Sequence, residues 1–252
     1  MTQLLFLHGV GGGHHAWDKQ LPYFADRGYA AHAWDQPGYG HTPLVEPYDL
    51  EQVSASLKRL IDTLVASANE QVVLVGHSMG GFIAQETYLR YPGCAKALVL
   101  AFTSPAFGGG GGGGDFARQF IAARTGALDA GKTMAQVAAE LMPTMRGAKS
   151  SAEGLALAQS IMAGIEPDTY RKAVALLTTF DRKNDLKKID VPTLVVSGSE
   201  DRTAPPKVME RMAKEIPGAR YALLEGCGHL GPMDQPEAFN DAVLRFLKES
   251  KL

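Results

Sequence analysis

The sequence has few of the features that mark membrane-spanning, disulfide-rich or nucleic-acid-binding proteins. Its two cysteines, Cys94 and Cys227, cannot form a disulfide framework, which predicts a reduced, cytoplasmic compartment. The opening residues, MTQLLFLHG, lack the basic region of a secretory signal and favour the same compartment. No apolar run reaches the length that crosses a bilayer, so we expect no membrane span. A net charge of −2 at pH 7 leaves no basic excess for nucleic acid.

The sequence also lacks a convincing site for a metal or a phosphate group. His14 and His15 are adjacent, so their side chains diverge, and no carboxylate is suitably spaced near them. The glycine run at 108–114 is followed by Asp115 and Phe116 rather than by the Lys and Ser/Thr of a phosphate-binding loop. The run is either a flexible connection or an engineered replacement, and the sequence leaves both open.

Short apolar runs alternate with amphipathic helical patterns along most of the 252 residues. Near-continuous apolar strands separated by helices are typical of a parallel sheet that is covered on both faces. The sequence therefore predicts an α/β fold with a mostly parallel sheet of about six strands flanked by helices. The expected strands lie within residues 4–9, 29–38, 71–76, 96–102, 192–198 and 220–226.

The alternation stops between residues 105 and 182, where only helical periodicity remains. Met134, Val137 and Leu141, for example, share one face of an expected helix. The block follows the carboxyl end of a strand, and ligands bind at that edge of open α/β sheets. We therefore expect residues 105–182 to form a helical lid, inserted into a core made of residues 1–104 and 183–252.

The segment GHSMG at 76–80 lies between an apolar strand and an expected helix. It matches the G-x-S-x-G pattern, in which a tight strand-to-helix turn exposes the serine hydroxyl at the edge of the sheet. Glycines on either side of Ser78 remove Cβ atoms where strand and helix would collide. This context predicts Ser78 as a nucleophile rather than as a simple helix cap.

A serine nucleophile needs a base and an acid that orients the base. If the chain order is serine, acid, histidine, His229 is the one histidine of seven that follows Ser78. Asp201 directly follows a buried strand, in a turn bounded by Gly198 and two prolines, and is favoured over its neighbour Glu200 as the acid.

An oxyanion hole requires two backbone N–H groups near the developing negative charge. Met79, the residue after the serine, supplies one of them. The loop after the first strand, HGVGGGHHAW, supplies the other, with Val10 as the first choice and Gly11 as the second.

With these residues in place, the chain resembles the α/β-hydrolase superfamily. The resemblance rests on HGVGGG, DQPGYG, GHSMGG, SGSEDRTAPP and GCGHLGPMDQP, which occur in the family's order. It implies that Ser78 is the nucleophile, Asp201 the acid and His229 the base, and that no cofactor is needed. The stretches FDRKNDLKKIDVPTLVV and GHLGPMDQPEAFNDAVLRFL resemble the 3-oxoadipate enol-lactonase-like branch of small bacterial hydrolases.

The predicted function is hydrolysis of a small-to-medium carboxylic ester or lactone through an acyl-serine. Alternatives are C–C bond hydrolysis of a vinylogous diketone by the same triad, or a non-hydrolytic receptor that binds a small ligand under the lid. The sequence does not define the oligomeric state. Apolar residues and few cations in the lid predict a preference for uncharged or weakly polar substrates. The candidate substrate-binding residues are Trp17, Phe102, Phe107, Phe120, Arg124, Met134, Leu141 and Met162.

Overall fold

The computed structural model describes residues 2–65, 70–110 and 114–252, and within them a single six-stranded sheet has the order β2-β1-β3-β4-β5-β6. Every neighbouring pair of strands is parallel. The expectation of an α/β fold with about six mostly parallel strands is confirmed. The strands are β1 (Thr2–Leu7), β2 (Ala30–Trp34), β3 (Gln71–His77), β4 (Ala97–Ala101), β5 (Thr193–Gly198) and β6 (Arg220–Leu224).

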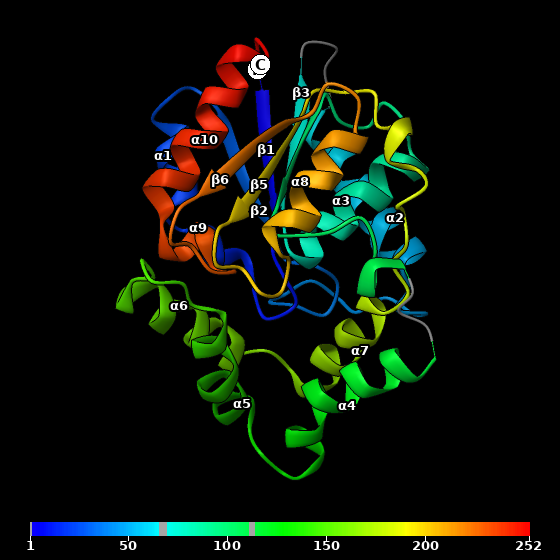
Figure 1. The fold of residues 1–252 in the computed structure, drawn as a ribbon. Helices are drawn as coiled ribbons and strands as arrows, with labels where there is room; N and C mark the ends of the chain where they lie inside the picture. The colour runs from blue at the N-terminus through cyan, green and yellow to red at the C-terminus, as the bar shows by residue number, and fades with distance from the viewer. Residues whose placement is uncertain (1, 66–69, 111–113) are drawn as a thin grey trace.

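Helices cover both faces of this sheet (Figure 1). Helices α1 and α10 lie on one face, and α2, α3 and α8 lie on the other. Because both faces are covered, the central strands β3 and β4 are buried almost throughout, which explains why they read as continuous apolar runs. The core helices are α1 (Gln20–Ala25), α2 (Leu50–Leu64), α3 (Met79–Arg90), α8 (Pro206–Glu215), α9 (Gly231–Asp234) and α10 (Pro236–Glu249), with the short 3₁₀ turns η1 (His14–Trp17) and η4 (Leu186–Lys188).

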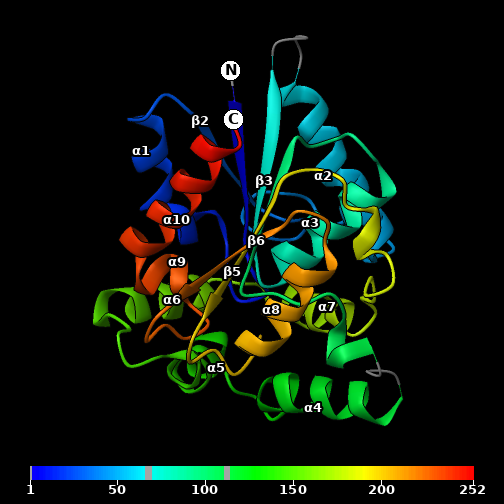
Figure 2. The same cartoon turned by 45° about the horizontal axis from the view of Figure 1, so that its top comes forward.

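Between β4 and β5 the chain forms helices that lie beyond the carboxyl edge of the sheet (Figures 1 and 2). We call α4 to α7 the inserted helices. The elements of this segment are η2 (Phe107–Gly110), α4 (Asp115–Asp129), α5 (Met134–Leu141), η3 (Met142–Met145), α6 (Ala152–Ala163) and α7 (Pro167–Leu177). The helices expected from the periodicity of residues 105–182 are therefore present in the structure. Residues 111–113, in the middle of the glycine run, lie outside the described residues.

The two ends of the inserted segment are joined to each other. The Phe107 N–H donates to the Phe180 carbonyl at 2.8 Å, and the Arg182 N–H donates to the Pro105 carbonyl at 2.8 Å. Ala106 and Asp181 form an isolated antiparallel bridge between these two bonds. The segment therefore leaves the core and returns to it at one place.

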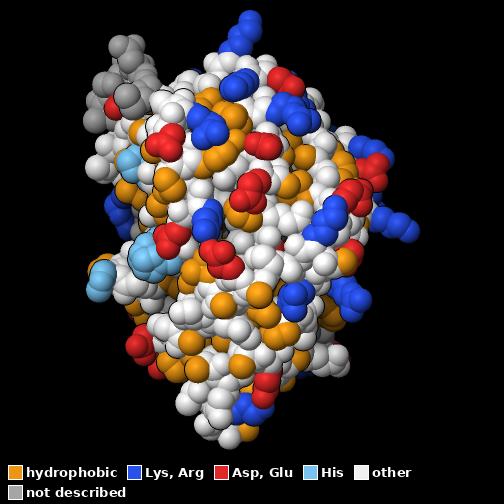
Figure 3. Space-filling model, turned by 90° about the vertical axis from the view of Figure 1, so that its left-hand side faces the viewer, with side chains coloured by type: hydrophobic (Ala, Val, Ile, Leu, Met, Phe, Trp, Pro, Cys, Tyr) orange, Lys and Arg blue, Asp and Glu red, His pale blue; other side chains and the backbone are white. Residues whose placement is uncertain are grey.

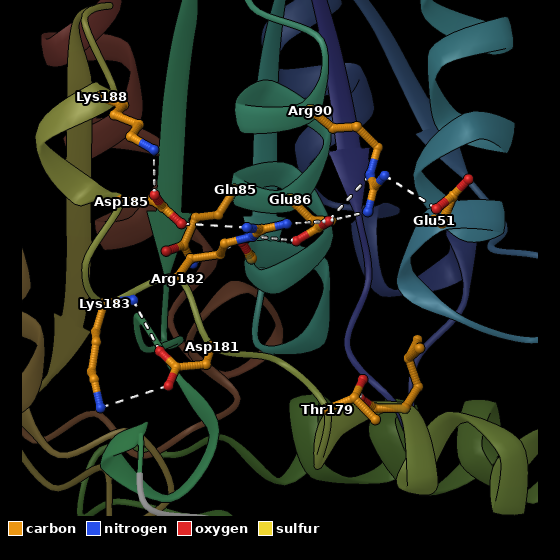
Figure 4. Close-up of polar contacts among 12 residues, drawn as sticks. Glu51, Gln85, Glu86, Arg90, Thr179, Asp181, Arg182, Lys183, Asp185 and Lys188 are labelled. Carbon is orange, nitrogen blue, oxygen red and sulfur yellow. Dashed lines mark hydrogen bonds and ion pairs between the residues drawn. The ribbon is translucent and has the colours of Figure 1, made fainter.

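A buried carboxylate ties the end of the inserted segment to helix α3 (Figure 4). The Glu86 side chain is 1% exposed and accepts hydrogen bonds from Arg182 at 2.6 and 2.7 Å and from Arg90 at 2.9 Å. Burial alone would raise the pKa of Glu86, but the hydrogen bonds and charge of Arg182, together with those of Arg90, lower it below its usual value. The Phe82 ring of α3 and the Phe180 ring near the end of the inserted segment also stack, with centroids 4.2 Å apart.

Acidic and basic side chains are interspersed over the face of the molecule shown in Figure 3. Within the described part of the chain, no helix is long and apolar enough to cross a membrane.

Candidate active site

Ser78 lies at the turn between β3 and α3, in a backbone conformation that non-glycine residues rarely adopt. Its φ and ψ are 53° and −117°. Two glycines make the turn sterically feasible. A methyl group on Gly76 would lie 2.4 Å from the Gly80 carbonyl oxygen, and one on Gly80 would lie 2.1 Å from the Leu7 carbonyl oxygen. The sequence pattern thus produces the strained turn that it predicts, with Ser78 at the carboxyl edge of the sheet.

Three predicted side chains form one hydrogen-bonded chain at this edge. Ser78 Oγ lies 3.0 Å from His229 Nε2, and His229 Nδ1 lies 2.8 Å from Asp201 Oδ2. Both His229 and Asp201 are buried. The second oxygen of Asp201 accepts the Thr203 and Ala204 N–H groups at 2.7 and 3.0 Å. These bonds hold the carboxylate so that it faces the imidazole.

The alternative acid, Glu200, points elsewhere. Its carboxylate accepts the Ala148 N–H at 2.9 Å, in the connection between η3 and α6. The structure therefore brings Asp201, and not Glu200, to His229.

The loop that carries His229 is held from two sides. The His229 N–H donates to the Met145 carbonyl at 2.8 Å, and the His229 carbonyl lies 2.8 Å from His77 Nε2, which donates to it. Burial is the main cause, and the nearby His229 the second, that lowers the pKa of His77 to about 3. His77 is therefore neutral at pH 7 and carries one ring proton, which it donates from Nε2 to the His229 carbonyl. The inserted segment thus contributes directly to the position of His229.

The two predicted oxyanion donors come from α3 and from the loop after β1. Met79 is the first residue of α3, so its N–H has no acceptor within the helix, and the helix terminus carries a partial positive charge there. Val10 lines the same cavity as Ser78. The loop of Val10 runs close to the serine, because a methyl group on Gly9 would lie 3.1 Å from Ser78 Cβ.

Ser78 and His229 open into a cavity between the sheet edge and the inserted helices. Of the predicted substrate-binding residues, Phe120, Arg124, Leu141 and Met162 line it. Among the described lining residues, Arg124 is the one side chain with a formal charge at pH 7. Its guanidinium lies 5.3 Å from the centre of the Phe120 ring, and no acidic side chain of the described residues pairs with it.

The other four predicted residues are not among the described residues that line this cavity. Trp17 is fully buried, with its ring 5.0 Å from that of Phe6. Phe102 is also fully buried and packs closely under Gly231. Both were expected at the cavity as aromatic residues of core loops, but both pack in the core instead. Phe107 packs against Phe120 with ring centroids 4.8 Å apart, and Met134 is a buried core residue.

Several cavity residues were not identified from the sequence. Tyr170, Val174 and Leu177 line the cavity from one face of α7. The spacing of these three, at i, i+4 and i+7, could have revealed that face. Thr203 lies in the loop that follows Asp201, and Met233 lies in the short helix α9 after His229, and no sequence periodicity marks either residue.

Among the described residues, no group of three His, Cys, Asp or Glu side chains is arranged to hold a metal ion. The two adjacent histidines do not diverge as expected, since their ring centroids are 3.9 Å apart, but each binds a separate carboxylate. His14 Nδ1 lies 2.6 Å from Asp35, and His15 Nδ1 lies 3.1 Å from Asp18.

Comparison with known proteins gives a consistent family. A non-heme chloroperoxidase of Kitasatospora aureofaciens is 30% identical over 98% of this chain and 92% of its own length. A pimeloyl-[acyl-carrier protein] methyl ester esterase of Neisseria meningitidis is 25% identical over 95% of this chain and 91% of its own.

Solved structures share the fold. The esterase EaEST of Exiguobacterium antarcticum superposes with a TM-score of 0.88 at 23% identity, covering 98% of this chain and 92% of its own. The enol-lactonase of Burkholderia xenovorans gives 0.83 at 22% identity, covering 98% and 91%. At these identities the likeness establishes the fold alone. A profile of the alpha/beta hydrolase family matches residues 4–242, which is nearly the whole chain with its serine turn and its histidine loop. The protein therefore belongs to the alpha/beta hydrolase family.

Proposed function

We propose that this protein is a serine hydrolase that cleaves a small-to-medium carboxylic ester or lactone through an acyl-serine intermediate. The observation that carries the proposal is the hydrogen-bonded chain from Ser78 through His229 to Asp201, which opens into an apolar cavity. An esterase among the relatives supports the same class of reaction.

In this mechanism each of the three hydrogen-bonded residues Ser78, His229 and Asp201 has a separate role. His229 Nε2 removes the proton of Ser78 as the hydroxyl attacks the substrate carbonyl, and returns it to the leaving alkoxide. Asp201 keeps Nδ1 protonated and stabilises the imidazolium that forms. The Met79 and Val10 N–H groups bind the oxyanion of the tetrahedral intermediate. Water then attacks the acyl-serine. His229 removes a proton from the water and returns it to Ser78 as the carboxylic acid product leaves.

The cavity supports an apolar substrate of modest size. Methionines contribute much of its wall, and their flexible thioethers adapt to differently shaped acyl groups. Arg124 is partly exposed, so water can solvate its guanidinium without a substrate carboxylate. We therefore propose that the enzyme prefers uncharged or weakly polar esters and lactones.

The direct test is pre-steady-state hydrolysis of p-nitrophenyl acetate. We expect a burst of p-nitrophenol stoichiometric with enzyme, followed by slower turnover, and neither in Ser78→Ala. The matched control is Ser160→Ala, which removes an exposed hydroxyl from α6 and should behave as wild type. A folded wild-type protein that binds small acyl compounds without any burst or turnover would instead indicate a ligand receptor.

A further inference from the structure

The loop that follows β1, residues 8–14, is hydrogen-bonded to the segment that follows β2. This segment is the DQPGYG motif at 35–40, which has no part in the chemistry proposed above. The contacts run from Gln36 N–H to His8 Nε2 (3.2 Å), from Gln36 Nε2 to the His8 carbonyl (2.5 Å), from Tyr39 Oη to the Val10 carbonyl (2.8 Å) and from His14 N–H to Asp35 (2.8 Å).

The contacts of His8 determine its tautomer. A backbone N–H can only donate, so the bond from Gln36 makes His8 Nε2 an acceptor and places the ring proton on Nδ1. Nδ1 lies 2.8 Å from the Gly9 carbonyl oxygen and therefore donates to it. The side-chain amide nitrogen of Gln36 is 3.4 Å from Nδ1 but donates to the His8 carbonyl instead. Burial lowers the pKa of His8 to about 4, so the ring stays neutral at pH 7.

The Gly9 carbonyl accepts a second hydrogen bond, from the Gly12 N–H at 2.9 Å. Two donors therefore fix the peptide that joins Gly9 to Val10. In a trans peptide the N–H points opposite to the C=O, so the Val10 N–H is directed away from His8. The next peptide, between Val10 and Gly11, is fixed in the same way by Tyr39, whose hydroxyl donates to the Val10 carbonyl.

We propose that His8 and Tyr39 are positioning residues for the oxyanion hole. His8 orients the peptide that presents the Val10 N–H, and Tyr39 orients the peptide that presents the Gly11 N–H. This inference rests on the proposed function, because an oxyanion forms only if Ser78 attacks a carbonyl. An N–H that is held in advance stabilises the charge that develops in the transition state more than it stabilises bound substrate. Its loss should therefore lower kcat with little change in KM.

Three variants separate the contributions. His8→Leu removes the ring donor while keeping an apolar side chain, and His8→Asn offers an amide N–H near the place of Nδ1. Tyr39→Phe removes only a hydroxyl. The control is His32→Leu, a partly buried histidine of β2 that bonds to Gln3 at 2.8 Å on the same sheet and lies outside the cavity lining.

Three quantities are measured. The burst amplitude with p-nitrophenyl acetate titrates the active sites, and kcat per titrated site and KM come from steady-state kinetics. Inhibition by a trifluoromethyl ketone is compared with inhibition by its fluorine-free analogue. Removing a whole oxyanion donor costs about 10²–10³ in kcat. We expect a loss of about 10- to 100-fold in kcat for His8→Leu, partial recovery in His8→Asn, and about 3- to 10-fold for Tyr39→Phe. Inhibition by the trifluoromethyl ketone should weaken in parallel, whereas inhibition by the fluorine-free ketone should not.

The outcomes distinguish this inference from the proposed function. Wild-type turnover that is absent in Ser78→Ala supports the hydrolase, whatever the other variants do. Normal kcat per titrated site in both His8 variants would overturn the role of His8, and normal kcat in Tyr39→Phe would overturn that of Tyr39. A loss that appears only in KM, or equally in His32→Leu, would also overturn the inference. If His8→Leu does not fold, the test rests on His8→Asn and Tyr39→Phe. The inference is overturned if the trifluoromethyl ketone inhibits both variants as tightly as it inhibits the wild type.

Discussion

The wall of the cavity formed by the core and the wall formed by the inserted helices are held by different interactions. On the core side, backbone groups and buried polar side chains fix the position of each group, as the bonds around Asp201 and His8 show. On the inserted side, apolar side chains pack against one another, as Phe120 does against Phe107. Hydrogen bonds fix direction, whereas apolar packing depends mainly on buried area. Substitutions in the core wall should therefore change kcat, and those in the inserted wall should change KM.

The largest effect should come from the base. We expect His229→Ala to lower kcat by about 10⁴-fold or more, because the members of such a chain act as a unit. Asp201→Asn should cost a comparable or somewhat smaller factor, since the amide leaves the imidazole in the wrong tautomer. Steady-state kinetics with p-nitrophenyl acetate checks both.

A control for these variants is His41→Ala, which removes an exposed histidine and should leave kcat unchanged. Near-normal turnover in His229→Ala would show that the assignment of the base is wrong.

The second effect concerns stability, at the contact between the two regions. Glu86→Gln removes the negative charge that pairs with Arg182 and Arg90, and should lower the free energy of unfolding at pH 7 by about 2–4 kcal/mol. Urea denaturation measures this. Glu51→Gln, at the exposed partner of Arg90, should cost no more than about 0.5 kcal/mol.

The pH dependence of this contact has a defined sign. Because folding lowers the pKa of Glu86, the stabilisation is fully present above the usual glutamate pKa and is lost as the pH falls through the lower, folded-state value. The stability difference between wild type and Glu86→Gln should therefore shrink on acidification below about pH 4.5. A difference that stays constant from pH 7 to pH 3 would contradict the role of charge.

A smaller effect is expected at the inserted wall. Phe120→Ala removes apolar contact surface from the cavity and should weaken binding of substrate and transition state alike by about 1 kcal/mol, a roughly fivefold rise in KM. The matched control is Phe116→Ala, on the same helix but exposed and outside the cavity lining. A fall in kcat at constant KM in Phe120→Ala would contradict the proposed difference between the core wall and the inserted wall.

The smallest effect is expected from Arg124. We compare kcat/KM for p-nitrophenyl butyrate with that for a p-nitrophenyl ester bearing a terminal carboxylate, and expect the butyrate to be preferred. Arg124→Ala should change this ratio by no more than about threefold, well below the tenfold, or about 1.4 kcal/mol of differential binding, that a dedicated carboxylate site would supply. Arg118→Ala, at an exposed arginine that pairs with Asp115, serves as the control. A preference above tenfold for the carboxylate-bearing ester that disappears in Arg124→Ala would contradict this prediction and favour an enol-lactonase-like substrate.

The two regions also differ in how far the sequence predicted them. The turn at Ser78 follows from local chemistry, because only glycine fits where strand and helix cross. The sheet follows from continuous apolar runs. His229 was selected by the chain order serine, acid, histidine, and Asp201 by its place directly after a buried strand. The rule that the carboxyl ends of parallel strands meet at one edge then explains why both lie near Ser78.

The cavity wall was harder to predict, because an apolar residue looks the same in sequence whether it packs the core or lines a cavity. Trp17 and Phe102 were assigned to the cavity and lie in the core, whereas Tyr170 was overlooked. The role of Met145 could not be predicted at all, since it acts through a backbone carbonyl that any residue carries.

The joined ends of the inserted segment have a consequence for protein engineering. Because residues 105–107 and 180–182 are bonded to each other, we expect the core to tolerate another module grafted between them at a small cost in chain entropy. Backbone contacts between the inserted segment and the loop of His229 limit such grafts. The replacement must offer a carbonyl at the place of Met145, or the loop of His229 loses a partner. The Lys149 N–H also donates to the Gly226 carbonyl in this loop, at 2.9 Å. Chimaeras that swap substrate range therefore need to match these backbone contacts as well as the two ends.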